Sequence, residues 1–329
     1  MTTGSPLVLW LGLAGLLGAA MIAVVITIVL PRLQPALERL APARRARVLT
    51  ALCLAPLGAG ALLMLACLLP SLYAALWPTL DHCTRHADDH LHLCLVHPPA
   101  ATLGLTALLV GAAGSAMFLV RGLPGVVRLY RANRVLARLH AASVPADLAG
   151  VRSVDSDVAF SFAGGILHAD IFLSRGLRER VDEAQLAAVL AHERAHVRRR
   201  DVLRRHVARV GALLHLPGAG RTLLSALELA CEEACDAEAA VTLGDRVQVA
   251  QAIVAVARLA PRPPPAVAAT AVGFTGEALT HRVTALLATP PRESAASWWS
   301  FPAALGALVL LAPGLHHATE TVLSLLARP

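Results

Sequence analysis

Four stretches of the chain are almost continuously apolar and carry no charged side chain. They cover residues 7–30, 51–77, 101–120 and 298–315. A helix needs about 20 apolar residues to cross the hydrocarbon core of a bilayer, so each stretch predicts a transmembrane helix. The first is too long for a cleaved signal peptide, and no positive side chain precedes it. The last is the shortest, and a buried helix with a proline kink is the alternative there.

The composition agrees with a membrane protein. Hydrophobic residues make up 56% of the 329 residues, the mean hydropathy is +0.62, and only 16% of the residues are charged. Soluble domains carry about 25% charged residues, which argues against an ordinary cytosolic enzyme. All 29 basic residues are arginine. The absence of lysine excludes Schiff-base catalysis, a P-loop lysine and the S-x-x-K acylation motif.

The arginines predict how the chain is oriented in the membrane. They are concentrated in the loop expected at 31–50 and in the segment after the third stretch, whereas the loop 78–100 holds only Arg85. The positive-inside rule therefore places residues 121–297 in the cytoplasm and the short tail 316–329 outside. The net charge of +7 fits contact with membrane lipid better than direct nucleic-acid binding. The proline-rich, all-arginine composition is typical of bacteria, so the expected location is the inner membrane.

The outer loop 78–100 is unusually rich in metal-binding residue types. Five of the 14 histidines lie between His82 and His97, together with Cys83 and Cys94. In an oxidising compartment the simplest expectation is a Cys83–Cys94 disulfide with solvated histidines around it. The alternative is a patch that senses metal or pH.

The cytoplasmic segment begins with strand-like pieces and continues as helices. The strands are expected at 151–154, 158–163 and 166–174, with Gly164-Gly165 as a hairpin turn. Asp182 is the predicted N-cap of the first helix. The helices are expected at about 182–210, 221–243, 246–260 and 276–288.

The first of these helices contains a metal-binding motif, His192-Glu193-Arg194-Ala195-His196. Two histidines four residues apart lie on one face of a helix, so both imidazoles can bind one ion. Chance would give about 0.02 matches to H-E-x-x-H in this composition. The spacing predicts a zinc site in which Glu193 is the general base that takes the proton of a water molecule.

A catalytic zinc takes three protein ligands and keeps one position open. The second helix offers Glu228, Glu232 and Asp236 at intervals of four along one face. We expect Glu232 to be the third ligand, with Glu228 and then Cys235 as alternatives. Asp236 is expected to orient a ligand histidine through its second ring nitrogen. Glu233 points off this face and is expected to be solvated.

These residues resemble the BlaR/MecR-type family of integral membrane zinc peptidases. The resemblance rests on the run from Leu190 to Asp201, which contains H-E-x-x-H-x-x-R-R-D, on Glu232-Glu233-Ala234-Cys235-Asp236, and on the strand segment 160–177 ahead of the metal helix. It extends to the order of three spans, a peptidase domain and a fourth span. HtpX-type and CAAX-prenyl proteases share H-E-x-x-H and a distal E-x-x-x-D. The β-lactam-sensing members carry a further outer domain that residues 316–329 do not contain.

The resulting expectation is an α-helical membrane protein with four transmembrane helices. A mainly α (α+β), zincin-like cytoplasmic metallopeptidase domain, residues 121–297, lies between spans three and four. The resemblance implies an endopeptidase that signals by cleaving a protein substrate, either a winged-helix repressor or itself. The alternatives are an HtpX-type quality-control protease and a non-proteolytic metal-sensing protein. A substrate strand is expected along the 158–174 hairpin, and His281-Arg282 is a weak candidate for stabilising the oxyanion, with surface charge as the simpler interpretation.

Overall fold

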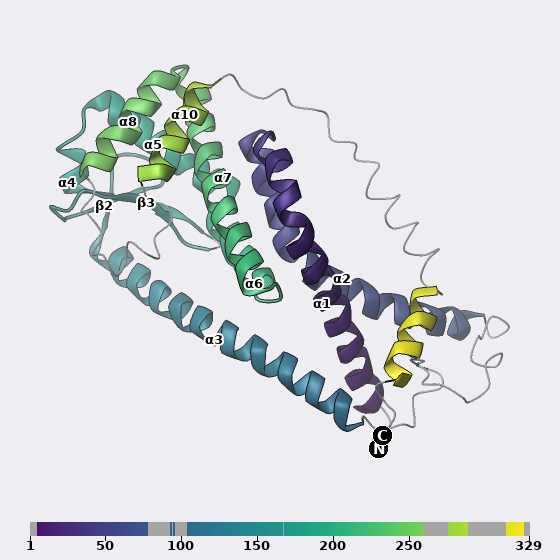
Figure 1. Cartoon of the computed structure of the whole chain (residues 1–329). Helices are drawn as coiled ribbons and strands as arrows, with labels where there is room; N and C mark the ends of the chain where they lie inside the picture. The colour runs from purple at the N-terminus through teal and green to yellow at the C-terminus, as the bar shows by residue number, and fades with distance from the viewer. Residues whose placement is uncertain are drawn as a thin grey trace.

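The computed structural model describes residues 5–77, 93, 95, 104–166, 168–259, 276–288 and 314–325. Three long helices, α1 (Ser5–Glu38), α2 (Pro42–Leu76) and α3 (Leu105–Ala142), lead into a compact α/β unit (Figure 1). All three are long and apolar enough to cross a membrane. Most of the predicted fourth span, 298–315, lies outside the described residues, as does most of the outer loop with Cys83 and Cys94.

The first two long helices extend well beyond the predicted spans. The segment 31–50, expected as a loop, is helical except at 39–41. The reason is packing, because Leu30 and Leu37 of α1 and Leu49 of α2 are buried against Leu223 and Leu227. The apolar contacts between α1 and α2 therefore extend to residues 223 and 227 of the α/β unit. The expected outer tail is also partly helical, over residues 314–325.

The α/β unit contains a small mixed sheet. Its strands are β1 (Val144–Pro145), β2 (Val151–Val154), β3 (Ser161–Gly164) and β4 (Asp170–Ser174), in the order β1-β2-β4-β3. β2 pairs with β4 in parallel, and β3 pairs with β4 in an antiparallel hairpin, as predicted. The two strands are shorter than predicted, because Gly164 is the last residue of β3 and β4 begins at Asp170. Gly165 has φ +118°, and a Cβ there would collide with the carbonyl of His168, so the turn requires glycine.

Helices cover the sheet and complete the unit. They are α4 (Arg175–Arg178), α5 (Glu183–Arg199), α6 (Asp201–Ala212), α7 (Pro217–Leu243), α8 (Arg246–Leu259) and α10 (Gly276–Leu287). Asp182 caps α5 as predicted, within a capping box shared with Gln185. Ile171 and Leu173 of β4 pack against Val189 and Leu190 of α5. The sheet thereby fixes the position of α5.

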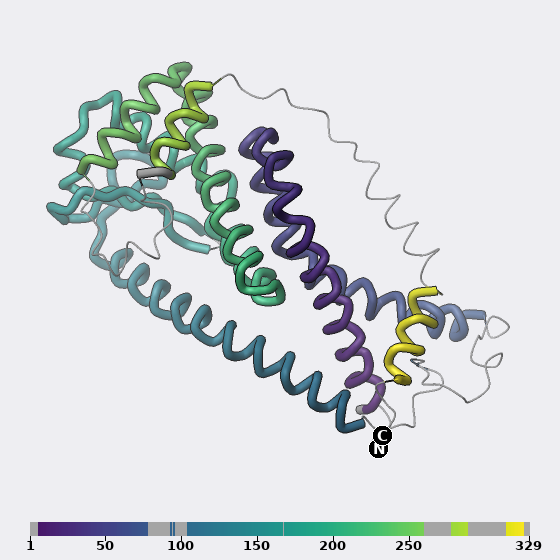
Figure 2. Tube along the Cα trace, in the orientation of Figure 1, coloured from purple at the N-terminus to yellow at the C-terminus, as the bar shows by residue number. Residues whose placement is uncertain are grey.

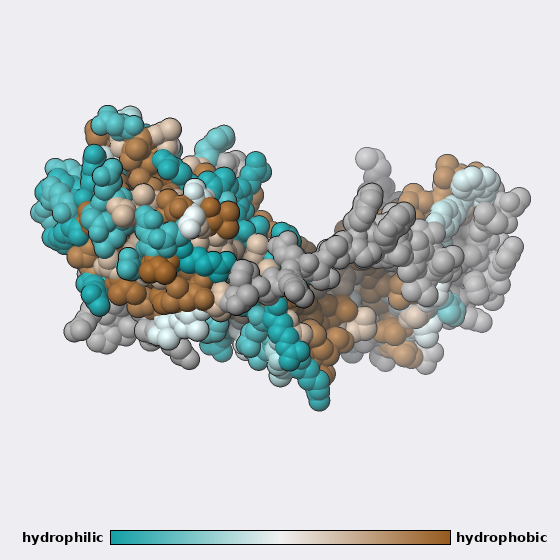
Figure 3. All heavy atoms as spheres, turned by 90° about the horizontal axis from the view of Figure 1, so that it is seen from above, coloured by the Kyte–Doolittle hydropathy of each residue, from teal (hydrophilic) through white to brown (hydrophobic). Residues whose placement is uncertain are grey.

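The predicted helix 182–210 is broken at Arg200. This residue has φ 53° and ψ 40°, in the left-handed region, and it separates α5 from α6. The chain turns there, and α6 packs against α7. Figure 2 traces the backbone of the α/β unit in teal and green. Hydrophilic side chains gather over the α/β unit, while hydrophobic side chains lie along the long helices away from it (Figure 3).

Candidate metal centre

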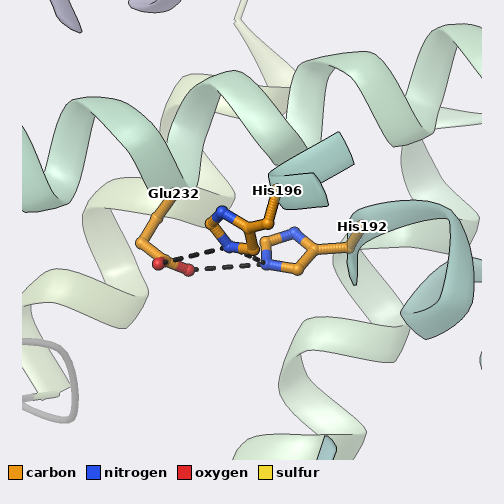
Figure 4. Close-up of side chains that lie close together, drawn as sticks. All are labelled: His192, His196 and Glu232. Atoms are coloured by element: carbon orange, nitrogen blue, oxygen red, sulfur yellow. Dashed lines mark hydrogen bonds and ion pairs between the residues drawn. The ribbon is translucent and has the colours of Figure 1, made fainter. Parts of the chain in front are cut away.

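The two histidines of the motif lie one turn apart on α5, with their Nε2 atoms facing the same point. These atoms are 3.1 Å apart. The carboxylate of Glu232, on α7, faces them from the neighbouring helix (Figure 4). Its Oε2 lies 3.5 Å from His192 Nε2, and its Oε1 lies 3.5 Å from His196 Nε2. The structure thus brings the three predicted ligands together.

The donor set and its spacing fit a zinc ion. Ligand atoms at about 2.0–2.2 Å from a tetrahedral zinc are about 3.3 Å from one another. The three distances between the donor atoms of His192, His196 and Glu232 range from 3.1 to 3.5 Å. Two imidazoles and one carboxylate are also the ligands of a known class of catalytic zinc site, which leaves one position open.

Each histidine has a carboxylate beside its second ring nitrogen. Asp236 Oδ1 lies 2.8 Å from His192 Nδ1, as predicted for an orienting residue, although the ring N–H is not aligned on the oxygen. Asp201 Oδ2 lies 3.0 Å from His196 Nδ1. A carboxylate in this position keeps the proton on Nδ1 and leaves the Nε2 lone pair for a metal.

Asp201 has a place in the site that the sequence pattern did not predict. On one continuous helix, five residues from His196 to Asp201 amount to a rotation of about 140°, away from the histidine. The left-handed conformation of Arg200 reverses the chain, and the Asp201 carboxylate returns to the His196 ring. The sequence feature that could have indicated this contact is the aspartate that ends the H-E-x-x-H-x-x-R-R-D run.

Two arginines flank the third ligand. Arg205 of α6 donates from Nη2 to Glu232 Oε1 at 2.7 Å, and Arg282 Nη1 of α10 lies 3.4 Å from Oε2. Arg282 also donates twice to Asp236, at 2.8 Å each, and its side chain is only 17% exposed. The expectation that Arg282 is a surface charge is therefore wrong, since it fixes two acidic residues of the site.

Glu233 is the second correction. It was expected in solvent, but its side chain is only 2% exposed. It forms an ion pair with Arg45 of α2, and its Oε1 lies 2.9 Å from His281 Nδ1 of α10. Successive residues of a helix are about 100° apart, so Glu232 faces α5 while Glu233 faces α2 and α10.

The alternative ligands lie elsewhere. Glu228 accepts a hydrogen bond from Arg209 at 2.9 Å and is not part of the cluster. Cys235 is buried with its Sγ 3.2 Å from His196 Nδ1, behind the ring and not on the Nε2 side. Glu193, the predicted base, is buried, with 7% of its surface exposed, next to His192 in the sequence.

The electrostatics of the cluster favour a cation. Burial lowers the pKa of His192, but Asp236 and Glu232 outweigh it and raise that pKa to about 10. Burial likewise lowers the pKa of His196, and the hydrogen bonds to Asp201 and Glu232 raise it above its usual value. Burial raises the pKa of Glu232, but the two histidines bring it well below its usual range. The site therefore stabilises positive charge, which a divalent ion would supply in place of the two protons.

Comparison with known families agrees with a metallopeptidase. Residues 129–281, just under half of the chain, match the model of Peptidase family M48. The matched range contains both histidines, Glu193, Glu232 and Asp236. M48 peptidases are generally zinc-dependent, so the match supports a membrane-associated metallopeptidase of this kind. No curated protein and no solved structure gives a significant match.

Proposed function

We propose that this protein is a membrane-anchored zinc endopeptidase. The observation that carries the proposal is the triangle of His192, His196 and Glu232 donor atoms, with a carboxylate behind each histidine. Bound zinc would polarise a water molecule and the carbonyl of the peptide bond. Glu193 would accept the water proton and pass it to the leaving amine.

The sheet supplies a place for the substrate backbone. β3 is an edge strand, and it packs beside α5, which carries the two histidines. An extended peptide can add to such an edge through main-chain hydrogen bonds. We infer that the substrate lies along β3, where the partly exposed Phe162 contributes apolar contact. This mode requires an unfolded segment of protein and accommodates many sequences.

We propose that the protein lies in a bacterial inner membrane, with the α/β unit on the cytoplasmic side. The arginine-rich segment 31–50 includes the turn between α1 and α2, and this turn lies at the same end of the long helices as the α/β unit (Figure 2). The positive-inside rule places this end in the cytoplasm, where the arginines can also contact anionic lipid.

Orientation can be tested by labelling cysteines in intact cells. A thiol reagent that does not cross the inner membrane should label a reporter cysteine at Asp88 and not one at Ala141. Detergent lysis should make both positions reactive, which controls for access. Labelling at Ala141 in intact cells would place the α/β unit outside.

The biological role that we propose is signalling by cleavage of a transcriptional repressor. This proposal rests on the resemblance to BlaR/MecR-type peptidases. The resemblance is found in the run from His192 to Asp201 and in the later run from Glu232 to Asp236. An HtpX-type role in quality control would use the same chemistry on many damaged membrane proteins. The two roles differ in the number of substrates.

The test compares the proteomes of cells carrying wild-type protein and Glu193→Gln. The variant should lose cleavage and keep about one zinc per chain, because Glu193 is the base and not a ligand. Glu228→Gln, on α7 and paired with Arg209, is the matched control and should behave like wild type. Accumulation of one repressor supports signalling, and accumulation of many membrane proteins supports quality control. Normal cleavage by Glu193→Gln would refute the peptidase mechanism.

A further inference from the structure

The thiol of Cys235 lies at the back of the candidate metal centre. Its Sγ is 3.2 Å from His196 Nδ1 and donates to Asp201 Oδ2 at 3.3 Å. The Nδ1 and Oδ2 atoms are themselves 3.0 Å apart, so the three atoms form a closed triangle. All three residues are buried. The triangle is therefore shielded from water, on the side of the imidazole that faces away from Nε2.

The other buried cysteines of the described chain have apolar surroundings. Cys53 and Cys231 lie in the cluster that joins the long helices to α7, and Cys67 lies in the cluster around Trp10. A buried cysteine in such a place behaves as a small hydrophobic residue. Cys235 differs from them, because its sulfur contacts a ring nitrogen and a carboxylate oxygen. Packing alone therefore does not account for the thiol at this position.

The carboxylate of Asp201 is held by donors from three helices. His196 of α5 and Cys235 of α7 contact its Oδ2, whereas Arg204 of α6 donates to its Oδ1 at 2.9 Å. A carboxylate oxygen has two lone pairs, so both contacts to Oδ2 can be present at once. Cys235 also lies three residues after Glu232 on α7. The thiol thereby joins the helix of the third ligand to the helix of the two histidines.

The charges around the triangle indicate what the thiol does. Arg199 Nε lies 3.5 Å from Asp201 Oδ2, and Arg204 pairs with the other oxygen. Two cations at this carboxylate oppose a further cation among the same three atoms. When His196 binds a metal through Nε2, its proton stays on Nδ1, and Asp201 accepts it there. The thiol of Cys235 is then a donor that keeps the carboxylate in place, and not a ligand.

We propose that Cys235 is a positioning residue for the zinc ligand His196 and acts through Asp201. The proposal rests on the zinc site of the proposed function and deepens it. The S–H group fixes the direction of the carboxylate, and the carboxylate fixes the direction of the imidazole. Because Cys235 and Glu232 belong to the same helix, the contact also sets the distance between the third ligand and the histidines. Loss of the thiol should weaken metal binding although no ligand is removed.

The test measures the Co²⁺ affinity of the full-length protein in detergent, by competition with a chelator. Cys235→Ala should weaken it by about tenfold, the low end for loss of an outer partner, because S–H is a weak donor. Cys235→Ser keeps a donor and should recover most of the affinity. A packing role predicts the opposite order, since a hydroxyl is costlier than a methyl group in an apolar site. Cys231→Ala, one turn earlier on α7 and buried in an apolar cluster, is the matched control and should bind as wild type does.

A double-variant cycle tests whether Cys235 acts through Asp201. In an Asp201→Asn background, Cys235→Ala should have little further effect, because the acceptor of the thiol is already altered. Full additivity would overturn this action.

The remaining outcomes separate this proposal from the zinc site itself. Unchanged affinity in Cys235→Ala, or weaker binding by Cys235→Ser than by Cys235→Ala, would overturn the positioning role and leave the zinc site intact. A cobalt–thiolate charge-transfer band in wild type that Cys235→Ala abolishes would overturn it too, since Cys235 would be a ligand. Wild type that binds no Co²⁺ would refute the metal centre and, with it, the proposed peptidase.

Discussion

The candidate metal centre contains carboxylates that are close in the sequence but contact different groups. Glu232 faces the two histidines, Asp236 lies one turn later against His192, and Glu233 faces away toward α2. Asp201 lies beside His196 Nδ1, as Asp236 lies beside His192 Nδ1. The roles follow from the direction of each side chain, since the chemical groups are alike.

Removal of Glu232 should have the largest effect on metal affinity. Glu232→Ala deletes a charged ligand and leaves two histidines, so zinc per chain should fall well below one after dialysis. Asp201→Asn and Asp236→Asn should lower affinity by about 10–100-fold, as loss of an orienting partner does. Glu228→Ala should keep the metal, because Glu228 pairs with Arg209 outside the site. Zinc titration of purified variants measures all four, and metal loss in Glu228→Ala with retention in Glu232→Ala would show that the third ligand is misassigned.

Among the helices, the turn between α6 and α7 packs against α2 beside a proline, Pro56. Pro56 has no N–H, so the carbonyl of Leu52 lacks its helical donor. His215 Nε2 lies 3.1 Å from that oxygen and 3.2 Å from the oxygen of Cys53. Arg121 of α3 donates to the His215 carbonyl at 2.6 Å. Burial lowers the pKa of His215, which favours the neutral ring. The turn between α6 and α7 therefore forms hydrogen bonds with two of the long helices, α2 and α3.

Gly211 makes this close approach possible. A Cβ at Gly211 would collide with the backbone carbonyl of Cys53, so Gly211→Ala must push α6 away from α2. We expect a loss of about 1–3 kcal/mol in the free energy of unfolding, as for overpacked interiors. Gly218→Ala is the matched control, because a Cβ there meets no atom within 4 Å, and it should be neutral or slightly stabilising. Thermal or denaturant unfolding in detergent compares the two, and equal stability would argue against the tight contact.

In the whole molecule, buried charged side chains connect the long apolar helices to the candidate metal centre. Arg45 of α2 and Glu233 of α7 form a buried ion pair, and Glu233 adjoins the candidate ligand Glu232. His281 and Arg282 of α10 contact Glu233 and Asp236. A shift of α2 or α10 would therefore reach the metal centre directly. This connection links α2, one of the helices long and apolar enough to cross a membrane, to the candidate metal centre.

Breaking the ion pair from one side should be costly. Arg45→Met leaves the buried Glu233 with His281 as its remaining partner among the described residues. We expect a loss of about 3–5 kcal/mol in stability together with weaker zinc binding. Arg45→Met combined with Glu233→Gln should recover part of both, because the uncompensated charge is removed. Arg47→Met, on the exposed face of the same helix, should change stability by less than about 0.5 kcal/mol. Additive effects of Arg45→Met and Glu233→Gln in the double variant would exclude a direct coupling.

Several features of the fold and of the site follow from local patterns in the sequence. Uninterrupted apolar runs identified the three long helices, Asp182 marked the start of α5, and Gly164-Gly165 marked the β3–β4 hairpin. The spacing of His192 and His196 placed both rings on one face, because four residues complete about one turn of a helix. Intervals of four also selected the face of α7 that carries Glu232.

The contacts between groups that are distant in the sequence depend on tertiary packing. Arg45 and Glu233 are 188 residues apart, and their pairing depends on how α2 packs against α7. Arg282 reaches Asp236 from α10, and Asp201 reaches His196 through the left-handed turn at Arg200. The length of α1 and α2 beyond the apolar runs also follows from packing on α7. Periodicity gives the face on which a side chain lies, but the element that covers this face is set by the packing of the whole chain.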